Sequence, residues 1–258
     1  MSLDGLNAVV FGGCGGIGIA IGQRLLQEGV KKLFILDVAE LSDANLARLR
    51  EHSRDAQLLC KACDVSNRTE LKQILEKDVL EALGCVDILV NSAGIVEDEV
   101  PDKVIAVNLT GVINSCLIAL TKMSRANGGK GGVIVNVASI AGLEPVTFLP
   151  TYCATKHGIV GFTRSLGVQP VFNETGVKFI TICPGGTRTP MFQNCKILYT
   201  EVKVLQKMFQ ELKRYKPQSP DAVADCVIQA ILKGENGSTW ICNDGEISVH
   251  SFPQSKYL

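Results

Sequence analysis

Short apolar runs alternate with amphipathic stretches along most of the chain. The runs are rich in Val, Ile and Leu and end in Gly, Asp, Asn, Ser or Pro, a pattern typical of strands buried on both faces of a parallel sheet. They predict strands at residues 7–11, 33–37, 57–63, 86–90, 133–138, 177–183 and 239–242.

Between these runs, apolar residues at helical spacing predict helices. We expect them over residues 19–27, 67–83, 101–126, 151–171 and 221–232, with a further helical stretch up to residue 214. No linker or internal repeat divides the chain. Strands alternating with helices therefore predict an α/β fold: a Rossmann-type, doubly wound parallel sheet of about seven strands in a single domain, residues 1–258.

The composition excludes several classes of protein. The chain has 258 residues, of which 46% are hydrophobic, and a formal net charge of zero. No cluster of Lys or Arg suggests a nucleic-acid partner, and no apolar run approaches the roughly 20 residues of a membrane span. Because the first residues lack the basic and apolar regions of a signal peptide, we expect a cytoplasmic protein.

Ten cysteines in a cytoplasmic protein are expected to stay reduced. Cys60 and Cys63 form the only C-x-x-C pair, and no second pair completes a tetrahedral zinc site. Both lie in a predicted strand, where positions three apart point to opposite faces. The sequence therefore predicts no metal site.

A glycine-rich segment follows the first predicted strand and opens the first helix. Gly12, Gly16 and Gly18 allow a tight turn and close backbone approach, so the helix N-terminus can face a pyrophosphate. Asp37 follows Gly18 by nineteen residues, a spacing that suits a carboxylate on the adenosine ribose. This context predicts a dinucleotide site that prefers NAD to NADP, since Asp37 would repel the extra phosphate. The alternative for Asp37 is a residue that only caps a turn.

A second candidate site combines Tyr152, Lys156 and Ser139. Tyr152 and Lys156 are four residues apart, which puts both side chains on one face of a helix. A free phenol has a pKa of about 10, and a neighbouring ammonium favours the phenolate and brings that pKa toward neutrality. Ser139 ends the fifth predicted strand and could hold a substrate oxygen against the phenol. Taken alone, the Tyr/Lys pair is more often a half-buried tyrosine beside a solvated lysine.

Other polar residues follow the carboxyl ends of predicted strands, where open α/β sheets bind ligands, or lie on adjoining helices. They are Asp64, Asn91, Asn108 and Thr187. Asn108 could instead be a buried amide that binds backbone, and Thr187 and Thr189 could cap a helix. His157 is rotated away from the Tyr/Lys face and is interpreted as structural. Trp240 is interpreted as a core or dimer-contact aromatic.

Jointly, these residues resemble the motifs of the short-chain dehydrogenase/reductase family over essentially the whole chain. A finer resemblance to the insect alcohol dehydrogenase branch rests on residues 15–18, 33–37, 185–189 and 235–240. The sequence also resembles retinol and 15-hydroxyprostaglandin dehydrogenases. The resemblance implies an NAD-linked alcohol dehydrogenase that uses no metal.

The resemblance further implies roles for individual residues. Tyr152 is the general acid/base and Ser139 polarises the substrate oxygen. Lys156 lowers the tyrosine pKa and contacts the nicotinamide ribose, and Asn108 holds the proton relay. Cofactor contacts are implied for Gly12, Gly16, Ile17, Gly18, Asp37, Asp64, Val65, Asn91, Ala93, Gly94, Lys156, Pro184, Gly185, Thr187 and Thr189. Phe11 and Ser92 depart from the family pattern, which has threonine and asparagine there, but neither touches the proton chemistry.

The expected substrate is a hydrophobic alcohol rather than a charged metabolite, bound by segments 140–150 and 187–215, with a tail at 244–258. These segments offer apolar side chains for a pocket: Leu143, Val146, Phe148, Leu149, Met191, Phe192, Ile197, Leu198 and Tyr199. Their main charges are expected at its mouth: Glu144, Arg188 and Lys196. The same residues could alternatively close a loop over the core.

Two predicted helices, 101–126 and 151–171, are apolar around most of their circumference, which predicts a homodimer. Two alternatives to alcohol oxidation stay open. One is a protein of this fold that binds or stores a ligand without turnover. The other is an enzyme like the 15-hydroxyprostaglandin dehydrogenases.

Overall fold

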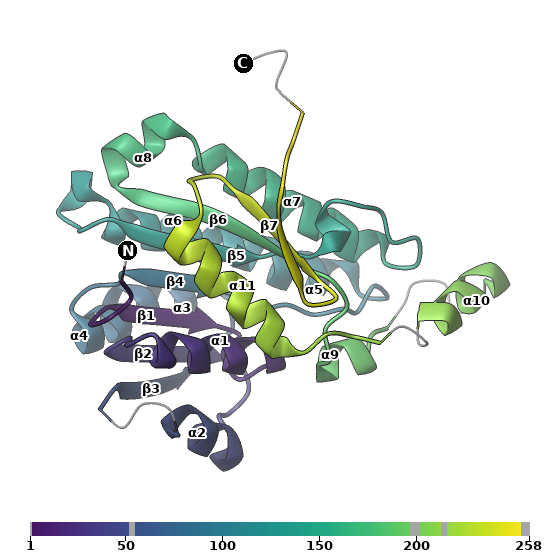
Figure 1. The fold of residues 1–258 in the computed structure, drawn as a ribbon, viewed down its shortest axis with the longest axis horizontal. Helices are drawn as coiled ribbons and strands as arrows, with labels where there is room; N and C mark the ends of the chain where they lie inside the picture. Colours follow the sequence, from purple (N-terminus) through teal and green to yellow (C-terminus); the bar gives the residue numbers. More distant parts are fainter. Residues whose placement is uncertain (1, 52–54, 197–201, 213–215, 254–258) are drawn as a thin grey trace.

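The computed structural model describes residues 2–51, 55–196, 202–212 and 216–253. An eight-stranded sheet with the order β3-β2-β1-β4-β5-β6-β7-β8 runs through its centre (Figure 1). The strands are β1 (Asn7–Phe11), β2 (Lys32–Asp37), β3 (Gln57–Ala62), β4 (Ile88–Asn91), β5 (Gly132–Val137), β6 (Val177–Pro184), β7 (Thr239–Asn243) and β8 (Glu246–His250). The first seven are parallel, and β8 pairs antiparallel with β7.

Helices cover both faces of the sheet. On one face lie α1 (Gly16–Gln27), α2 (Asp43–Arg50) and α11 (Pro220–Lys233). On the other face lie α3 (Arg68–Gln73), α4 (Leu80–Leu83), α5 (Pro101–Ile105), α6 (Val112–Met123) and α7 (Pro150–Leu166). Two apolar clusters, one on each face, form the core. The predicted fold class, a doubly wound Rossmann-type sheet, is confirmed.

Several predicted helices are divided in the structure. π-helical turns at Ile74–Val79 and Ala106–Gly111 interrupt the helices predicted at 67–83 and 101–126. The helix predicted at 151–171 ends at Leu166, and α8 (Gln169–Thr175) begins after Gly167 with Pro170 in its first turn. Because proline lacks a backbone N–H and restricts the residue before it, the chain starts a new helix there. Short helices α9 (Pro190–Gln193) and α10 (Lys203–Leu212) follow β6.

Two elements were not predicted, α2 and β8. Only Leu49 is buried in α2, so this helix carries almost no apolar period. β8 lies in the segment predicted as a polar tail. Asp244 (φ 52°) and Gly245 (φ 80°) join it to β7 in a two-residue turn. Positive φ at both positions is typical of a type I′ hairpin, so Asp-Gly was the signal that indicated β8.

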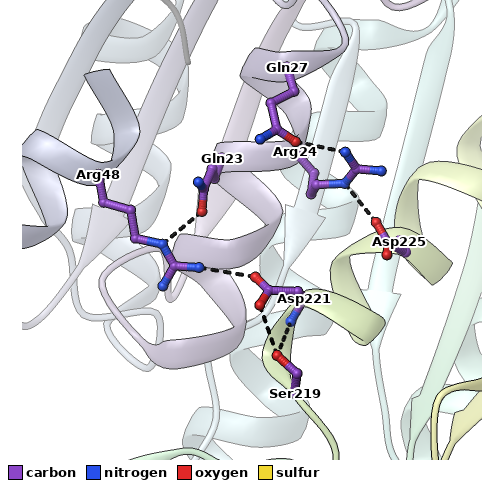
Figure 2. A network of polar contacts seen from close by, with 7 residues as sticks. All are labelled: Gln23, Arg24, Gln27, Arg48, Ser219, Asp221 and Asp225. Carbon is purple, nitrogen blue, oxygen red and sulfur yellow. Dashed lines mark hydrogen bonds and ion pairs between the residues drawn. The ribbon is translucent and has the colours of Figure 1, made fainter. Parts of the chain in front are cut away.

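Polar contacts join α11 to α1 and α2 (Figure 2). Arg24 on α1 forms an ion pair with Asp225 on α11 (2.7 Å). Arg48 on α2 bridges the other two helices, since it donates to Gln23 (2.7 Å) and pairs with Asp221 (3.0 Å). These side chains are partly exposed, so each pair stabilises the fold by about 0–1 kcal/mol.

The chain changes direction in the sheet between β1 and β4, which are neighbours although two strands separate them in sequence. β2 and β3 extend to one side of this point, and β5 to β8 extend to the other. The loops at the carboxyl ends of β1 and β4 therefore diverge and leave a crevice for a ligand. The glycine-rich turn follows β1, and Asn91 ends β4.

Candidate active site

The glycine-rich turn between β1 and α1 has the geometry of a dinucleotide cradle. Gly12 has a φ of +70°, and a Cβ there would lie 2.5 Å from the Ala93 backbone nitrogen. A Cβ on Gly18 would overlap the Gly12 carbonyl oxygen. No side chain caps the N-terminus of α1. Its backbone N–H groups and helix dipole therefore suit the phosphates of NAD.

Asp37 holds this turn in place. Its carboxylate accepts hydrogen bonds from the backbone N–H of Cys14 (2.9 Å) and of Ala39 (3.0 Å). The turn-capping alternative thus describes part of what Asp37 does. The carboxylate also lies at the carboxyl end of β2, beside the glycine-rich turn, where a ribose hydroxyl could donate to it. These residues fit NAD, and no contact among them conflicts with it.

The remaining cofactor candidates differ in where their side chains point. Asp64 accepts bonds from the backbone and hydroxyl of Ser66 (2.9 and 2.7 Å), so it caps the turn before α3. Val65 is buried against Gly111. Asn91 donates to Asn136 (2.8 Å) and accepts from Ser115 (2.7 Å) inside the protein. Only the backbone of Asn91 is therefore left for a cofactor contact.

A cavity of about 190 Å³ lies beside this turn, at the carboxyl ends of β4, β5 and β6. Nine of the candidate site residues line it: Ile17, Gly94, Ser139, Tyr152, Lys156, Pro184, Gly185, Thr187 and Thr189. The predicted wall residues Val146, Phe148, Leu149, Met191 and Phe192 line it as well. Eight further residues complete the described lining of the cavity: Ser92, Val96, Val137, Ala138, Ile140, Ala141, Gly186 and Cys195.

Not every expected wall residue reaches this cavity. Leu143 packs against the main core instead, because the 3-10 turn Ile140–Gly142 directs it there. Glu144 and Arg188 do not line the cavity either. Ile197, Leu198 and Tyr199 lie outside the described residues.

Ser139, Tyr152 and Lys156 meet at the cavity wall. The Ser139 hydroxyl follows β5, accepts a bond from the Ala141 N–H (3.1 Å) and donates to the Pro184 carbonyl (3.4 Å). Its side chain also forms a hydrogen bond with the Tyr152 phenol. The ammonium nitrogen of Lys156 lies 5.4 Å from the centre of the Tyr152 ring. His157 on the same helix is exposed and binds the Cys153 carbonyl, in agreement with a structural role.

The pKa of Tyr152 differs from the one expected from the sequence. Burial raises the pKa of Tyr152 to about 12, and the hydrogen bond with Ser139 opposes that rise. Lys156 is 4% exposed, and burial lowers its pKa to about 8. The expected net lowering of the tyrosine pKa is therefore wrong for this structure. The reason is that the ammonium donates to the Val137 carbonyl (3.0 Å) while the phenol loses its hydration.

Asn108 is buried in the π-helical turn Ala106–Gly111 and clamps the segment that follows Gly94. It donates to the Ile95 carbonyl and accepts from the Ile95 N–H, both at 2.8 Å. The buried-amide alternative therefore describes its side chain. A Cβ on Gly94 would lie 3.4 Å from the Asn108 amide oxygen and 3.7 Å from the Lys156 ammonium nitrogen. Asn108 thus lies next to Lys156 and holds the backbone at Gly94 and Ile95 in position.

Asp98 is a residue of this site that sequence reasoning missed. It is fully buried, and its carboxylate accepts bonds from the backbone N–H groups of Thr151 (2.8 Å) and Tyr152 (3.0 Å). The α7 N-terminus, which carries the phenol, is therefore capped from 53 residues away. The only local signal was an acidic residue in a loop, which is too common to single it out.

Thr187 and Thr189 line the cavity from the loop after β6. The Thr187 hydroxyl donates to the Gly185 carbonyl (2.9 Å), and the Thr189 hydroxyl caps α9 by accepting from the Phe192 N–H (3.2 Å). A Cβ on Gly16 would touch the Thr189 methyl group at 2.9 Å. The loop after β6 therefore lies directly against the glycine-rich turn, and Thr189 has the helix-capping role that was the alternative.

Comparison with known proteins agrees with this geometry. A family model described as short chain dehydrogenase matches residues 6–197. The chain belongs to the short-chain dehydrogenase family. Alcohol dehydrogenase 1 from Ceratitis capitata is 37% identical over 248 residues, which cover 96% of this chain and 95% of that protein.

Two further relatives span most of the chain. The 15-hydroxyprostaglandin dehydrogenase [NAD(+)] of Rattus norvegicus is 35% identical, covering 90% of this chain and 88% of that enzyme. A crystal structure of levodione reductase has a TM-score of 0.75 at 27% identity, covering 93% of this chain and 96% of the other. The predicted family, its alcohol dehydrogenase branch and the oxidoreductase class are confirmed. NAD(+) in the name of the rat relative supports the predicted cofactor.

Within the residues that the structure describes, no group of three or more His, Cys, Asp or Glu side chains is arranged to hold a metal ion. Cys60 is exposed and Cys63 is buried, so the two thiols of the C-x-x-C pair are oriented differently. None of the cysteines forms a disulfide with another described residue. Trp240 is 9% exposed and packs in the core cluster beside α11, in agreement with the core interpretation.

Proposed function

We propose that this enzyme uses NAD to interconvert a hydrophobic alcohol and its aldehyde or ketone. The observation that carries the proposal is the meeting of Ser139, Tyr152 and Lys156 at one wall of an apolar cavity beside the glycine-rich turn. In oxidation the alcohol loses its hydroxyl proton to the protein and a hydride from its carbon. The nicotinamide ring of bound NAD supplies the hydride acceptor.

The chain's own residues bind and orient the substrate and move the proton. The Ser139 hydroxyl holds the substrate oxygen, and the Tyr152 phenolate takes the proton directly or through Ser139. In the free protein the phenol is kept neutral, since its pKa is about 12. The buried ammonium of Lys156 and the positive charge of the oxidised nicotinamide both favour the phenolate. Oxidation should therefore become faster as the pH rises.

An apolar substrate suits the reacting end of the cavity. Its wall is formed mostly by Val, Ile, Leu, Phe, Met, Ala and Gly side chains, and Lys156 is the one charged residue among the described lining residues. We assign substrate binding to segments 140–150 and 187–196, both of which contribute to this wall. An alkyl chain gains about 0.8 kcal/mol for each CH₂ that it buries, so kcat/KM should rise with chain length or branching.

The test is Tyr152→Phe, assayed by NADH formation with aliphatic alcohols of increasing length and with retinol. General acid/base groups contribute about 10²–10⁴-fold, so kcat should fall by that factor while NAD affinity stays near wild type. A variant that kept more than about a tenth of the wild-type kcat would contradict the role of Tyr152. Absence of turnover by the wild-type protein with every alcohol would instead favour the ligand-binding alternative.

We also propose that the enzyme is a cytoplasmic homodimer. The helical stretch Pro101–Met123 is long and apolar enough to span a membrane by length and composition, yet only 39% of its most apolar window is buried in the monomer. Val112, Cys116 and Met123 pack in the core, whereas Ile105 and Leu117 are 42% and 45% exposed. A core helix with a second, exposed apolar side is suited to bury that side against another copy of the chain.

A further inference from the structure

A second cavity of about 680 Å³ adjoins the proposed active-site cavity. Cys195 lines both of them. Phe209 of α10 lines the second cavity and contacts Phe148 of the first edge to face, with ring centres 5.8 Å apart. Phe209 also packs on the apolar cluster of Val96, Phe148 and Leu149. A ligand that extends from the first cavity past this aromatic pair would therefore reach the second.

The two cavities differ in chemistry. Among the described residues that line the second cavity, three are lysines and one is a glutamate: Lys196, Lys203, Lys207 and Glu99. Glu97, next to this rim, lies 4.0 Å from Lys196 and 3.2 Å from Lys103, so it partly neutralises Lys196. Lys203 and Lys207 form no ion pair with any described residue. They are four residues apart on α10, so their ammonium groups share one face of the helix.

Two unpaired ammonium groups beside an apolar cavity create a local positive potential that would attract an anion. The backbone holds Lys196, on the same rim, next to the active site, because Lys196 pairs with the Val96–Asp98 segment through two hydrogen bonds of 3.1 Å. Asp98 of that segment caps the helix that carries Tyr152. Lys196 and the helix that carries the phenol are therefore anchored by the same segment, and α10 packs against it through Phe209. In Figure 1, α10 lies at the right-hand edge of the molecule. Its two lysines, Lys203 and Lys207, are exposed.

We propose that the substrate is an amphipathic alcohol with an anionic group at the end distant from the hydroxyl. Its hydroxyl and alkyl chain occupy the apolar cavity, and its anionic end lies between Lys203 and Lys207. This proposal rests on the proposed function and narrows it. The sequence predicted a hydrophobic alcohol rather than a charged metabolite, and we apply that prediction only to the end of the substrate that reacts. The reaction converts R₂CHOH and NAD⁺ to R₂C=O, NADH and H⁺, and the anionic group takes no part in it.

The test compares hydroxy fatty acids of increasing length with their methyl esters, which match them in shape but carry no charge. For wild type we expect a lower KM for the acid than for its ester, with the largest difference at one chain length. In Lys203→Gln/Lys207→Gln the KM ratio of ester to acid should fall about 3- to 10-fold, which corresponds to two largely exposed ion pairs. High salt should reduce the ratio in wild type as well.

The control is Lys31→Gln/Lys233→Gln, which removes the same charge from two exposed lysines at the amino-terminal end of the sheet. It should keep the wild-type ratio. Equal KM values for acid and ester in wild type, or an equal loss in the control, would overturn the proposal while leaving alcohol oxidation intact. Absence of turnover with neutral alcohols as well would reject the proposed function itself. A hydroxyalkyl phosphate in a parallel arm tells whether carboxylate or phosphate is the preferred anion.

Discussion

Removal of the Asp98 carboxylate tests how the fold positions the catalytic tyrosine. In Asp98→Ala, the backbone N–H groups of Thr151 and Tyr152 lose acceptors that lie 2.8 and 3.0 Å away. The site is fully buried, so water does not replace them easily. Each buried donor left without a partner costs about 1–3 kcal/mol, and the capping carboxylate also interacts favourably with the α7 dipole. We expect a total loss of about 2–5 kcal/mol.

Urea unfolding measures this loss. With an m-value of about 3 kcal/mol/M, the midpoint should fall by about 1 M. Activity gives a second readout, since the Tyr152 N–H is one of the two donors and the phenol shifts with its turn. A displacement near 1 Å can reduce catalysis by about 10²-fold, so kcat should fall more than KM changes. Asp98→Asn keeps one acceptor oxygen and should recover part of both losses.

Ser42→Ala provides the matched control, because Ser42 caps α2 in the same way but on an exposed helix remote from the cavity. Its loss should be about 0.5–1 kcal/mol, with kcat unchanged. If Asp98→Ala unfolded at the same urea concentration as Ser42→Ala and kept its kcat, the buried cap would not position Tyr152.

The other predictions concern the cofactor, the lysine and the dimer. Asp37→Asn should lower the ratio of kcat/KM for NAD over NADP by about 30–150-fold, the equivalent of about 2–3 kcal/mol of like-charge repulsion after screening; Asp43→Asn is the control, and an unchanged ratio would overturn the assignment. Lys156 has a pKa lowered from 10.5 to about 8 by burial, so between these values the unfolded chain binds more protons and the stability of the folded protein should rise with pH. Lys156→Met should abolish that rise, as measured by urea midpoints across the interval, and a variant with the wild-type slope would contradict it. Light scattering should give twice the chain mass of 27.7 kDa for wild type and a monomer for Leu117→Glu, and a monomeric wild type at micromolar concentration would reject the dimer.

The sequence by itself determined the sheet, the glycine-rich turn and the set of residues around the cavity. These features are local: a run of buried Val, Ile and Leu specifies a strand, and Gly12 is required by a φ of +70°. Nine of the candidate residues consequently line one cavity. α2 and β8 were missed because their own apolar patterns are weak and their places depend on neighbouring elements.

Only the tertiary structure decided how those residues are held and charged. Asp98 meets Thr151 across 53 positions and Asn91 meets Asn136 across 45, and no local pattern pairs residues so far apart. The pKa values of Tyr152 and Lys156 likewise depend on burial by surrounding elements, which reversed the direction expected for the tyrosine. The contact between Phe148 and Phe209 brings the lysines of α10 to the cavity. Spacing along a chain sets which residues share a face, whereas hydration and long-range contacts arise only when the elements pack together.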